Sequence, residues 1–215
     1  ELERYGMTAN GTLACTMYNG TELVLLSLAA AYGGYTLALL NPRLSADERQ
    51  LRLVELENAT GEHGMDVLTN QMVNRLLIDA TGFDATGFGL LPDDAAVLTR
   101  LQVELEQTVQ RYQERFDGDN AGLVMFTSGS SGTPKAAFLT WNSLMGSAAG
   151  ANEVLRYEEH GVWQMVLPLC HVGGFQILVR TLLSGNTFIV YERYQPQRIL
   201  NDVLSFRVTH ISVVD

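Results

Sequence analysis

A short stretch near the middle of the chain gathers residue types that bind phosphate. It runs Met-Phe-Thr-Ser-Gly-Ser-Ser-Gly-Thr-Pro-Lys from Met125 to Lys135 and follows an apolar run. Gly129 and Gly132 permit backbone conformations that other residues resist, and they let the main chain approach a ligand closely. Successive N–H groups in such a loop can form an anion-binding concavity. The hydroxyl groups beside them belong to Thr127, Ser128, Ser130, Ser131 and Thr133.

Lys135 is the only lysine in a chain that otherwise carries thirteen arginines. A compact, mobile ammonium group suits a phosphate that moves during a reaction, whereas a guanidinium is a rigid fork. The spacing differs from that of a P-loop, and no Gly-x-Ser-x-Gly elbow is present. The alternative to a phosphate site is a flexible Gly/Ser turn between two strands, which is a common feature.

His171 is the second residue in a position suited to chemistry. It follows the apolar stretch Val162–Cys170 and precedes Gly173 and Gly174. Residues at the carboxyl ends of parallel strands face the ligand crevice, and the two glycines would leave room for a substrate beside the imidazole. The alternatives are a histidine that caps the next helix or one that is buried in the core. The other histidines lack partners at metal-ligand spacing, so no metal site is predicted.

Composition excludes several classes of function. Hydrophobic residues make up 47% of the 215 residues, and the formal net charge is -10. A nucleic-acid partner is not expected, because proteins that bind nucleic acid present a basic face. No apolar run reaches membrane-spanning length, and the first residues do not resemble a signal peptide. Cys15 and Cys170 are expected to be buried thiols in a reducing compartment, which favours a cytoplasmic protein.

The elements that must position these residues alternate between strands and helices. Strands are predicted around residues 13–18, 36–40, 65–69, 122–126, 162–168, 186–191 and 209–214, and helices around residues 21–34, 45–59, 141–157, 173–185 and 195–206. This rhythm predicts an α/β fold with mostly parallel sheets flanked by helices. We divide the chain into a first βα block at 1–80, a loop and amphipathic helix at 81–120, and a second βα block with the phosphate loop at 121–215.

Three segments in this order resemble the adenylate-forming (acyl-CoA synthetase, AMP-binding) superfamily. They are the phosphate loop, the early segment from Met17 to Glu48 with its Asn-Pro-Arg-Leu, and the segment from Val166 to Val214 that contains His171. The last of these is most similar to o-succinylbenzoate–CoA ligases. The resemblance implies an enzyme that converts a small carboxylic acid and ATP into an acyl-adenylate and pyrophosphate, then transfers the acyl group to CoA.

The resemblance also assigns roles to residues. The loop from Thr127 to Thr133 would hold the ATP phosphates, and Lys135 would follow the departing pyrophosphate. His171, with Gly173 and Gly174, would shape the acid pocket without needing to transfer a proton. The family's cofactors are ATP, Mg²⁺ and CoA, and a homo-oligomer is a possible assembly.

The sequence also departs from the family pattern. Trp141-Asn142 stands where the family often has His-Arg or His-Lys. The family's later segments, which contact adenine, ribose and magnesium, and its C-terminal lid are not found. We therefore expect the N-terminal part of a ligase that is inactive alone. The alternatives are an adenylation domain of another adenylate-forming enzyme and a non-catalytic nucleotide-binding module. A serine hydrolase using a loop serine with His171 is disfavoured, because no elbow signature supports it.

Overall fold

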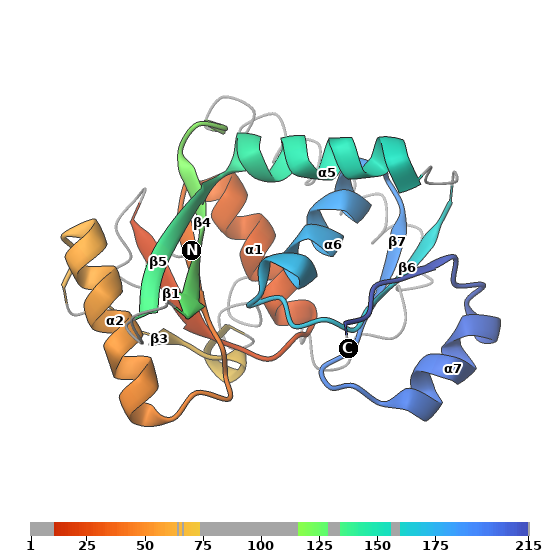
Figure 1. Cartoon of the computed structure of the whole chain (residues 1–215), viewed down its shortest axis with the longest axis horizontal. Helices are drawn as coiled ribbons and strands as arrows, with labels where there is room; N and C mark the ends of the chain where they lie inside the picture. Colours follow the sequence, from red (N-terminus) through yellow and green to blue (C-terminus); the bar gives the residue numbers. More distant parts are fainter. Residues whose placement is uncertain are drawn as a thin grey trace, which may run out of the picture.

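The computed structural model describes residues 11–63, 65, 67–73, 116–128, 134–155 and 160–214. These residues form two sheets (Figure 1). The first sheet has the strand order β3-β1-β2-β4-β5. Its strands are β1 (Thr12–Thr16), β2 (Thr36–Leu40), β3 (Val67–Leu68), β4 (Ala121–Ser128) and β5 (Pro134–Thr140). The second sheet has the order β7-β6-β8, with β6 (Val162–Met165), β7 (Thr187–Val190) and β8 (His210–Ile211).

Both sheets are parallel except at one edge. β1 pairs in parallel with β2 and β3, and β2 pairs in parallel with β4. The strands of the second sheet are also parallel to one another. Only the β4–β5 pair is antiparallel among the described strands. The predicted α/β fold with mostly parallel sheets and flanking helices is therefore confirmed.

Helices cover both faces of the first sheet. The described helices of the chain are α1 (Thr21–Gly33), α2 (Ala46–Thr60), α5 (Trp141–Leu155), α6 (Val172–Leu183) and α7 (Pro196–Ser205). α1 and α6 lie between the two sheets, α5 runs alongside both, and α2 lies on the outer face near β5 (Figure 1). Strand β2 has apolar side chains on both faces, so both faces must be packed against helices. Leu37 and Leu39 pack in the central core, whereas Ala38 and Leu40 pack under α2. Strands buried on both faces are typical of parallel sheets.

The start and end of α2 are fixed by local chemistry. The Ser45 hydroxyl accepts a hydrogen bond from the Glu48 N–H, and the Glu48 side chain accepts one from the Ser45 N–H. This reciprocal capping box satisfies N–H groups that a helix start leaves unpaired. Gly61 ends the helix at a φ of 73°, a left-handed conformation that favours glycine. The capped helix places Asn41 to Leu44, the turn before it, at the carboxyl end of β2.

Two features of the first sheet differ from the sequence-based expectation. The stretch from Pro134 to Thr140, taken as the end of a loop, forms β5 and pairs along its length with β4. β4 and β5 join the sheet of the first block rather than a sheet with β6, and the Thr36 hydroxyl donates to the Ala121 carbonyl at 2.7 Å across that junction. The order of strands in a sheet depends on long-range packing. The order of the strands along the chain does not determine it.

In the part of the chain that the structure describes, no helix is both long enough and apolar enough to cross a bilayer.

Candidate functional site: a crevice at the carboxyl ends of the strands

A polar cavity of about 250 Å³ opens at the carboxyl ends of four parallel strands. Its lining comes from residues 17–19 after β1, 41–43 after β2, the 166–171 stretch after β6, and 192–194 after β7. The cavity therefore lies where both sheets meet. Crevices outside the carboxyl ends of parallel strands are the usual ligand sites of open α/β sheets.

Asn19 joins the two sheets beneath this cavity. Its side-chain N–H donates to the Leu167 carbonyl at 2.9 Å, and its side-chain oxygen accepts from the Leu169 N–H at 2.8 Å. The residue is only 7% exposed, so both bonds form away from bulk water. Asn19 thereby fixes the stretch that leads into His171. The sequence analysis assigned Asn19 no role beyond its place in the family segment that begins at Met17.

His171 occupies the N-cap position of α6, yet its side chain makes no capping hydrogen bond. Its N–H donates to the Pro168 carbonyl at 3.1 Å, and its carbonyl accepts from the N–H groups of Gly174 and Phe175 at 3.0 Å each. The residue is exposed and lines the cavity. The backbone thus holds the helix start, which leaves the imidazole available to a ligand. Neither of the two alternatives, a capping or a core histidine, describes it.

The two glycines after His171 have different surroundings. A Cβ on Gly174 would lie 2.2 Å from the Pro168 carbonyl oxygen, whereas a Cβ on Gly173 would meet only the Leu167 Cδ1 at 3.8 Å. Gly174 is also buried, and Gly173 is exposed. The visible reason for Gly174 is therefore close packing of α6 on the preceding turn. Only Gly173 borders open space as the sequence analysis expected.

This difference gives a matched pair of substitutions. Gly174→Ala forces backbone apart and should lower the free energy of unfolding by roughly 1–3 kcal/mol or more, as overpacking does. Gly173→Ala should be neutral or slightly stabilising, because alanine favours a helix more than glycine does by about 1 kcal/mol. Thermal unfolding of the full-length gene product measures both. Equal effects would contradict the packing described for Gly174.

The ends of the phosphate loop are brought together by the β4–β5 hairpin. Thr127 pairs with Lys135 and Ser128 with Pro134 in the antiparallel register. Thr127 and Lys135 are both exposed. Residues directly opposite in such a pair project from the same face of the sheet. The hairpin thus presents a hydroxyl beside the chain's only lysine. Gly129, Ser130, Ser131, Gly132 and Thr133 lie outside the described residues.

The hairpin and the cavity share one edge of the first sheet. β4 is parallel to β2, with Leu37 level with Leu123 and Ala38 with Val124. The same register continued along both strands brings Asn41, which lines the cavity, level with Thr127. The structure therefore brings the base of the predicted phosphate loop and the His171 cavity to the same side of the molecule. Lys135 itself is not among the residues that line the cavity.

The two cysteines are free thiols buried next to this region. Burial raises the pKa of Cys170 to about 11, although the charge of Arg43 opposes the shift. Burial also raises the pKa of Cys15, and the neighbouring Cys170 adds to that shift. A thiolate is the reactive form, so both groups are inert at neutral pH. The expectation of buried thiols is confirmed.

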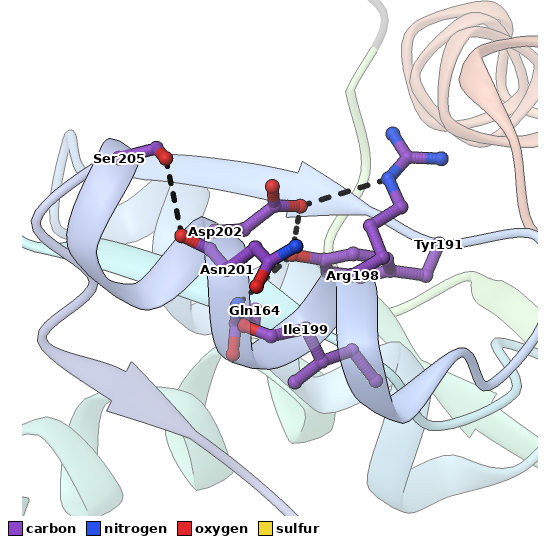
Figure 2. A network of polar contacts seen from close by, with 7 residues as sticks. All are labelled: Gln164, Tyr191, Arg198, Ile199, Asn201, Asp202 and Ser205. Carbon is purple, nitrogen blue, oxygen red and sulfur yellow. Dashed lines mark hydrogen bonds and ion pairs between the residues drawn. The ribbon is translucent and has the colours of Figure 1, made fainter.

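A buried polar network holds the strand end that carries Glu192, Arg193 and Tyr194 (Figure 2). Tyr191 donates from its hydroxyl to the Asp202 carboxylate at 2.8 Å and accepts from the Gln164 side-chain amide at 2.9 Å. Gln164 also donates to the Ile199 carbonyl at 2.8 Å. Since Gln164 lies in β6 and Asp202 in α7, the network ties α7 to the second sheet. It also fixes the chain where it enters the cavity wall.

The Tyr191 network predicts that the free energy of unfolding decreases at alkaline pH. Burial, followed by the hydrogen bond and charge of Asp202, raises the pKa of Tyr191 to about 12. The unfolded tyrosine loses its proton near pH 10. Stability is therefore full below about pH 10 and falls as pH rises toward 12, because the unfolded state releases the proton first. Urea unfolding should show a difference between wild type and Tyr191→Phe that shrinks over this range. A constant difference would contradict the network.

A larger cavity of about 370 Å³ lies between α1, α5 and α6. Its walls are mostly apolar, including Tyr32, Trp141 and Phe175. Among the described residues that line it, Tyr32 is the only titratable one, and Lys135 and His171 are both absent. Of these two residues, only His171 lines the smaller, polar cavity, and Lys135 lines neither of the two cavities.

Comparison with known proteins agrees with this geometry. A family model described as AMP-binding enzyme matches residues 2–215. The chain belongs to the AMP-binding enzyme family. The recognition made from three sequence segments is thereby confirmed.

Curated relatives of this AMP-binding chain carry a consistent name. The 2-succinylbenzoate–CoA ligase of Staphylococcus aureus strain JH9 is 27% identical over 202 residues, which cover 91% of this chain and 41% of the relative. The ligase of strain MSSA476 matches to the same extent, with 27% identity over 202 residues. The chain thus spans about two fifths of the length of these relatives.

Solved structures share the fold. The O-succinylbenzoate coenzyme A synthetase of Bacillus subtilis in complex with AMP aligns with a TM-score of 0.73 and 22% identity, over 100% of this chain and 51% of that chain. The same enzyme with ATP and magnesium ion aligns with a TM-score of 0.70 and 20% identity, over 98% and 52%. At this identity the likeness establishes the fold, which is that of the N-terminal part of these synthetases.

Proposed function

We propose that this chain forms the phosphate-binding and acid-binding part of an ATP-dependent carboxylic acid–CoA ligase whose acid is 2-succinylbenzoate. The reaction has two steps. A carboxylate oxygen attacks the α-phosphorus of ATP and expels pyrophosphate, and the CoA thiol then attacks the acyl carbon and releases AMP. Family membership and the names of the curated relatives support the reaction class and the acid.

One observation carries the proposal for the site. The hairpin that presents Thr127 and Lys135 ends at the same sheet edge as the cavity lined by His171. A reaction that joins a carboxylate to a phosphate needs an anion site next to an acid pocket.

Each residue has a positional role in this proposal. Backbone N–H groups and hydroxyls of residues 127–133 would hold the β- and γ-phosphates of ATP. Lys135 would neutralise charge on the pyrophosphate as it leaves, which is the main contribution a protein makes to phosphoryl-type transfer. His171 would orient the acid beside the α-phosphate, and Gly173 would keep the approach open. Holding the two reactants together removes much of the entropic barrier to reaction.

The remaining assignments follow from the reaction class. Mg²⁺ would accompany ATP, and CoA would be the acyl acceptor. We place the enzyme in the cytoplasm, in menaquinone biosynthesis, where its acid and both cosubstrates would be available. We also propose that residues 81–120 connect a first block at 1–80 to a second block at 121–215.

The experiment is an ATP–pyrophosphate exchange assay of the full-length gene product against a panel of acids. The panel contains 2-succinylbenzoate, malonate, an aryl acid and a medium-chain fatty acid. We expect exchange with 2-succinylbenzoate at a kcat/KM at least about tenfold above any other acid, since a missing polar contact reduces specificity by that order or more. Exchange that prefers a fatty acid would refute the acid, and absence of any acid-dependent exchange would refute the ligase.

A further inference from the structure

Two arginines face the cavity that contains His171. Arg43 follows β2 and Arg193 follows β7, so they reach the cavity from different sheets. Among the lining residues that the structure describes, Glu192 is the only one with a carboxylate. The whole chain carries a formal net charge of -10, so a cavity with more cations than anions is contrary to the overall balance. An excess of positive charge in a crevice attracts anions.

Local contacts hold both arginines at this position. The Arg43 N–H donates to the Asn41 side-chain oxygen at 2.9 Å, which fixes the turn after β2. The Arg193 guanidinium carbon lies 5.7 Å from the centre of the Tyr18 ring, within the range of a cation–π contact. Tyr18 is itself held by Asn70, which accepts from the Tyr18 N–H at 3.1 Å. The backbone of Arg43 and the guanidinium of Arg193 are therefore positioned before any ligand arrives.

The charged groups of these arginines remain available to a ligand. Arg193 pairs with Glu192 at 3.6 Å, but the two side chains are 66% and 62% exposed. Such an exposed pair is weak and can be exchanged for a better partner. For Arg43, the described part of the chain supplies no carboxylate partner. The positive charge of Arg43 acts to lower the pKa of Cys170, the residue before His171.

We propose that Arg43 and Arg193 form a carboxylate-binding subsite that selects a dicarboxylic acid. One carboxylate of the acid would face the phosphate hairpin and react, while the other would bind these guanidinium groups. This inference rests on the function proposed above and adds the residues that read the second, unreactive carboxylate. A planar guanidinium binds a carboxylate through two parallel hydrogen bonds, which lysine cannot match. The small volume of the cavity suits a compact acid.

The test compares two acids that differ by one group. 2-Succinylbenzoate has a second carboxylate on its ring, and 4-oxo-4-phenylbutanoate has hydrogen at that position. In the full-length protein, Arg43→Gln and Arg193→Gln should each lower kcat/KM for the diacid in pyrophosphate exchange by about tenfold or more, as expected for a lost bond to a charged group. For the monoacid the change should stay within about twofold. Arg52→Gln on α2, whose guanidinium donates to the Glu48 carbonyl, is the control and should change neither.

Two results would overturn the subsite. An equal loss for both acids would mean that the arginines do not read the second carboxylate. In the complete reaction with CoA, a higher KM for CoA as the only effect of the substitutions would mean that the anion bound is a phosphate of CoA.

A binding measurement separates this inference from the proposed function. If the wild-type protein exchanges pyrophosphate with neither acid, the proposed function fails. Calorimetric titration with 2-succinylbenzoate then decides the subsite alone. Weaker binding of 2-succinylbenzoate by both arginine variants than by the wild type would support the subsite. Equal binding by variants and wild type, or no binding by the wild type, would refute the subsite.

Discussion

Replacing Lys135 by alanine should lower the rate of acid-dependent ATP–pyrophosphate exchange by about a hundredfold or more in the full-length protein. Removal of a group that stabilises charge in the transition state has an effect of this order. Lys135 lies opposite Thr127 at the base of the hairpin and is exposed, so its loss should leave the fold intact. The measurement is kcat for exchange, with thermal unfolding to confirm that stability is unchanged.

Two further variants make the Lys135 test specific. Lys135→Arg keeps the charge but replaces a mobile ammonium with a rigid fork, so an intermediate rate is expected. Arg52→Ala removes a cation from α2, away from the cavity, and should leave the exchange rate unchanged. If Lys135→Ala and Arg52→Ala behave alike, Lys135 does not act on the departing phosphate.

Replacing Asn19 by alanine should destabilise the protein and disable the site together. The change leaves the Leu169 N–H and the Leu167 carbonyl without their bonds to Asn19. A buried group left unpaired costs about 1–3 kcal/mol. Because a loss of 1 kcal/mol lowers the Tm of a chain this size by about 2–4 °C, a fall of roughly 4–10 °C is expected. The stretch before His171 would also lose its anchor, so exchange should slow as well.

A matched asparagine provides the control for Asn19. Asn201 lies on the exposed side of α7, where its side-chain oxygen accepts from Gln197 at 3.1 Å. Asn201→Ala should change the Tm by no more than about 1–2 °C, since substitutions at exposed positions usually stay within about 0.5 kcal/mol. If Asn19→Ala is as mild as Asn201→Ala, the two sheets are joined by other contacts.

Local patterns made much of the fold predictable. The alternation of apolar runs with helical periodicity located the described helices and every described strand except β5, because these signals depend on neighbouring residues. The helix predicted around residues 195–206 corresponds to α7, which has Pro196 in its first turn. Such features are decided within a few residues of sequence, and the structure confirms them.

The pairing of β4 and β5 was not predictable in this way. Pro134, Lys135, Ala136 and Ala137 have little strand propensity, and no strand was predicted there. It becomes a strand because β4 offers it a complete ladder of backbone partners. The place of β4 beside β2 is also a long-range matter, since more than eighty residues separate the paired positions.

The sequence analysis singled out two residues of the candidate site but not the residues that hold their surroundings in place. Lys135 and His171 were singled out by residue type and position, and the structure brings the hairpin and the histidine to one edge. The contacts of Asn19 and Gly174 were not predicted. Asn19 binds the backbone of Leu167 and Leu169, which are distant in sequence, and Gly174 packs on the backbone of Pro168 in the preceding turn. Arg43 and Arg193 looked like ordinary surface cations until the two sheets placed them around one cavity.

The central claim is that an acid carboxylate in this crevice attacks the α-phosphorus of ATP. The most direct test supplies the full-length enzyme with ATP, CoA and 2-succinylbenzoate labelled with ¹⁸O in its reacting carboxylate. Attack on phosphorus makes one labelled oxygen the bridge between acyl group and AMP, and thiolysis by CoA breaks the acyl C–O bond. We therefore predict that the AMP formed carries one ¹⁸O atom and the pyrophosphate none. Label in inorganic phosphate, or AMP without label, would contradict the account.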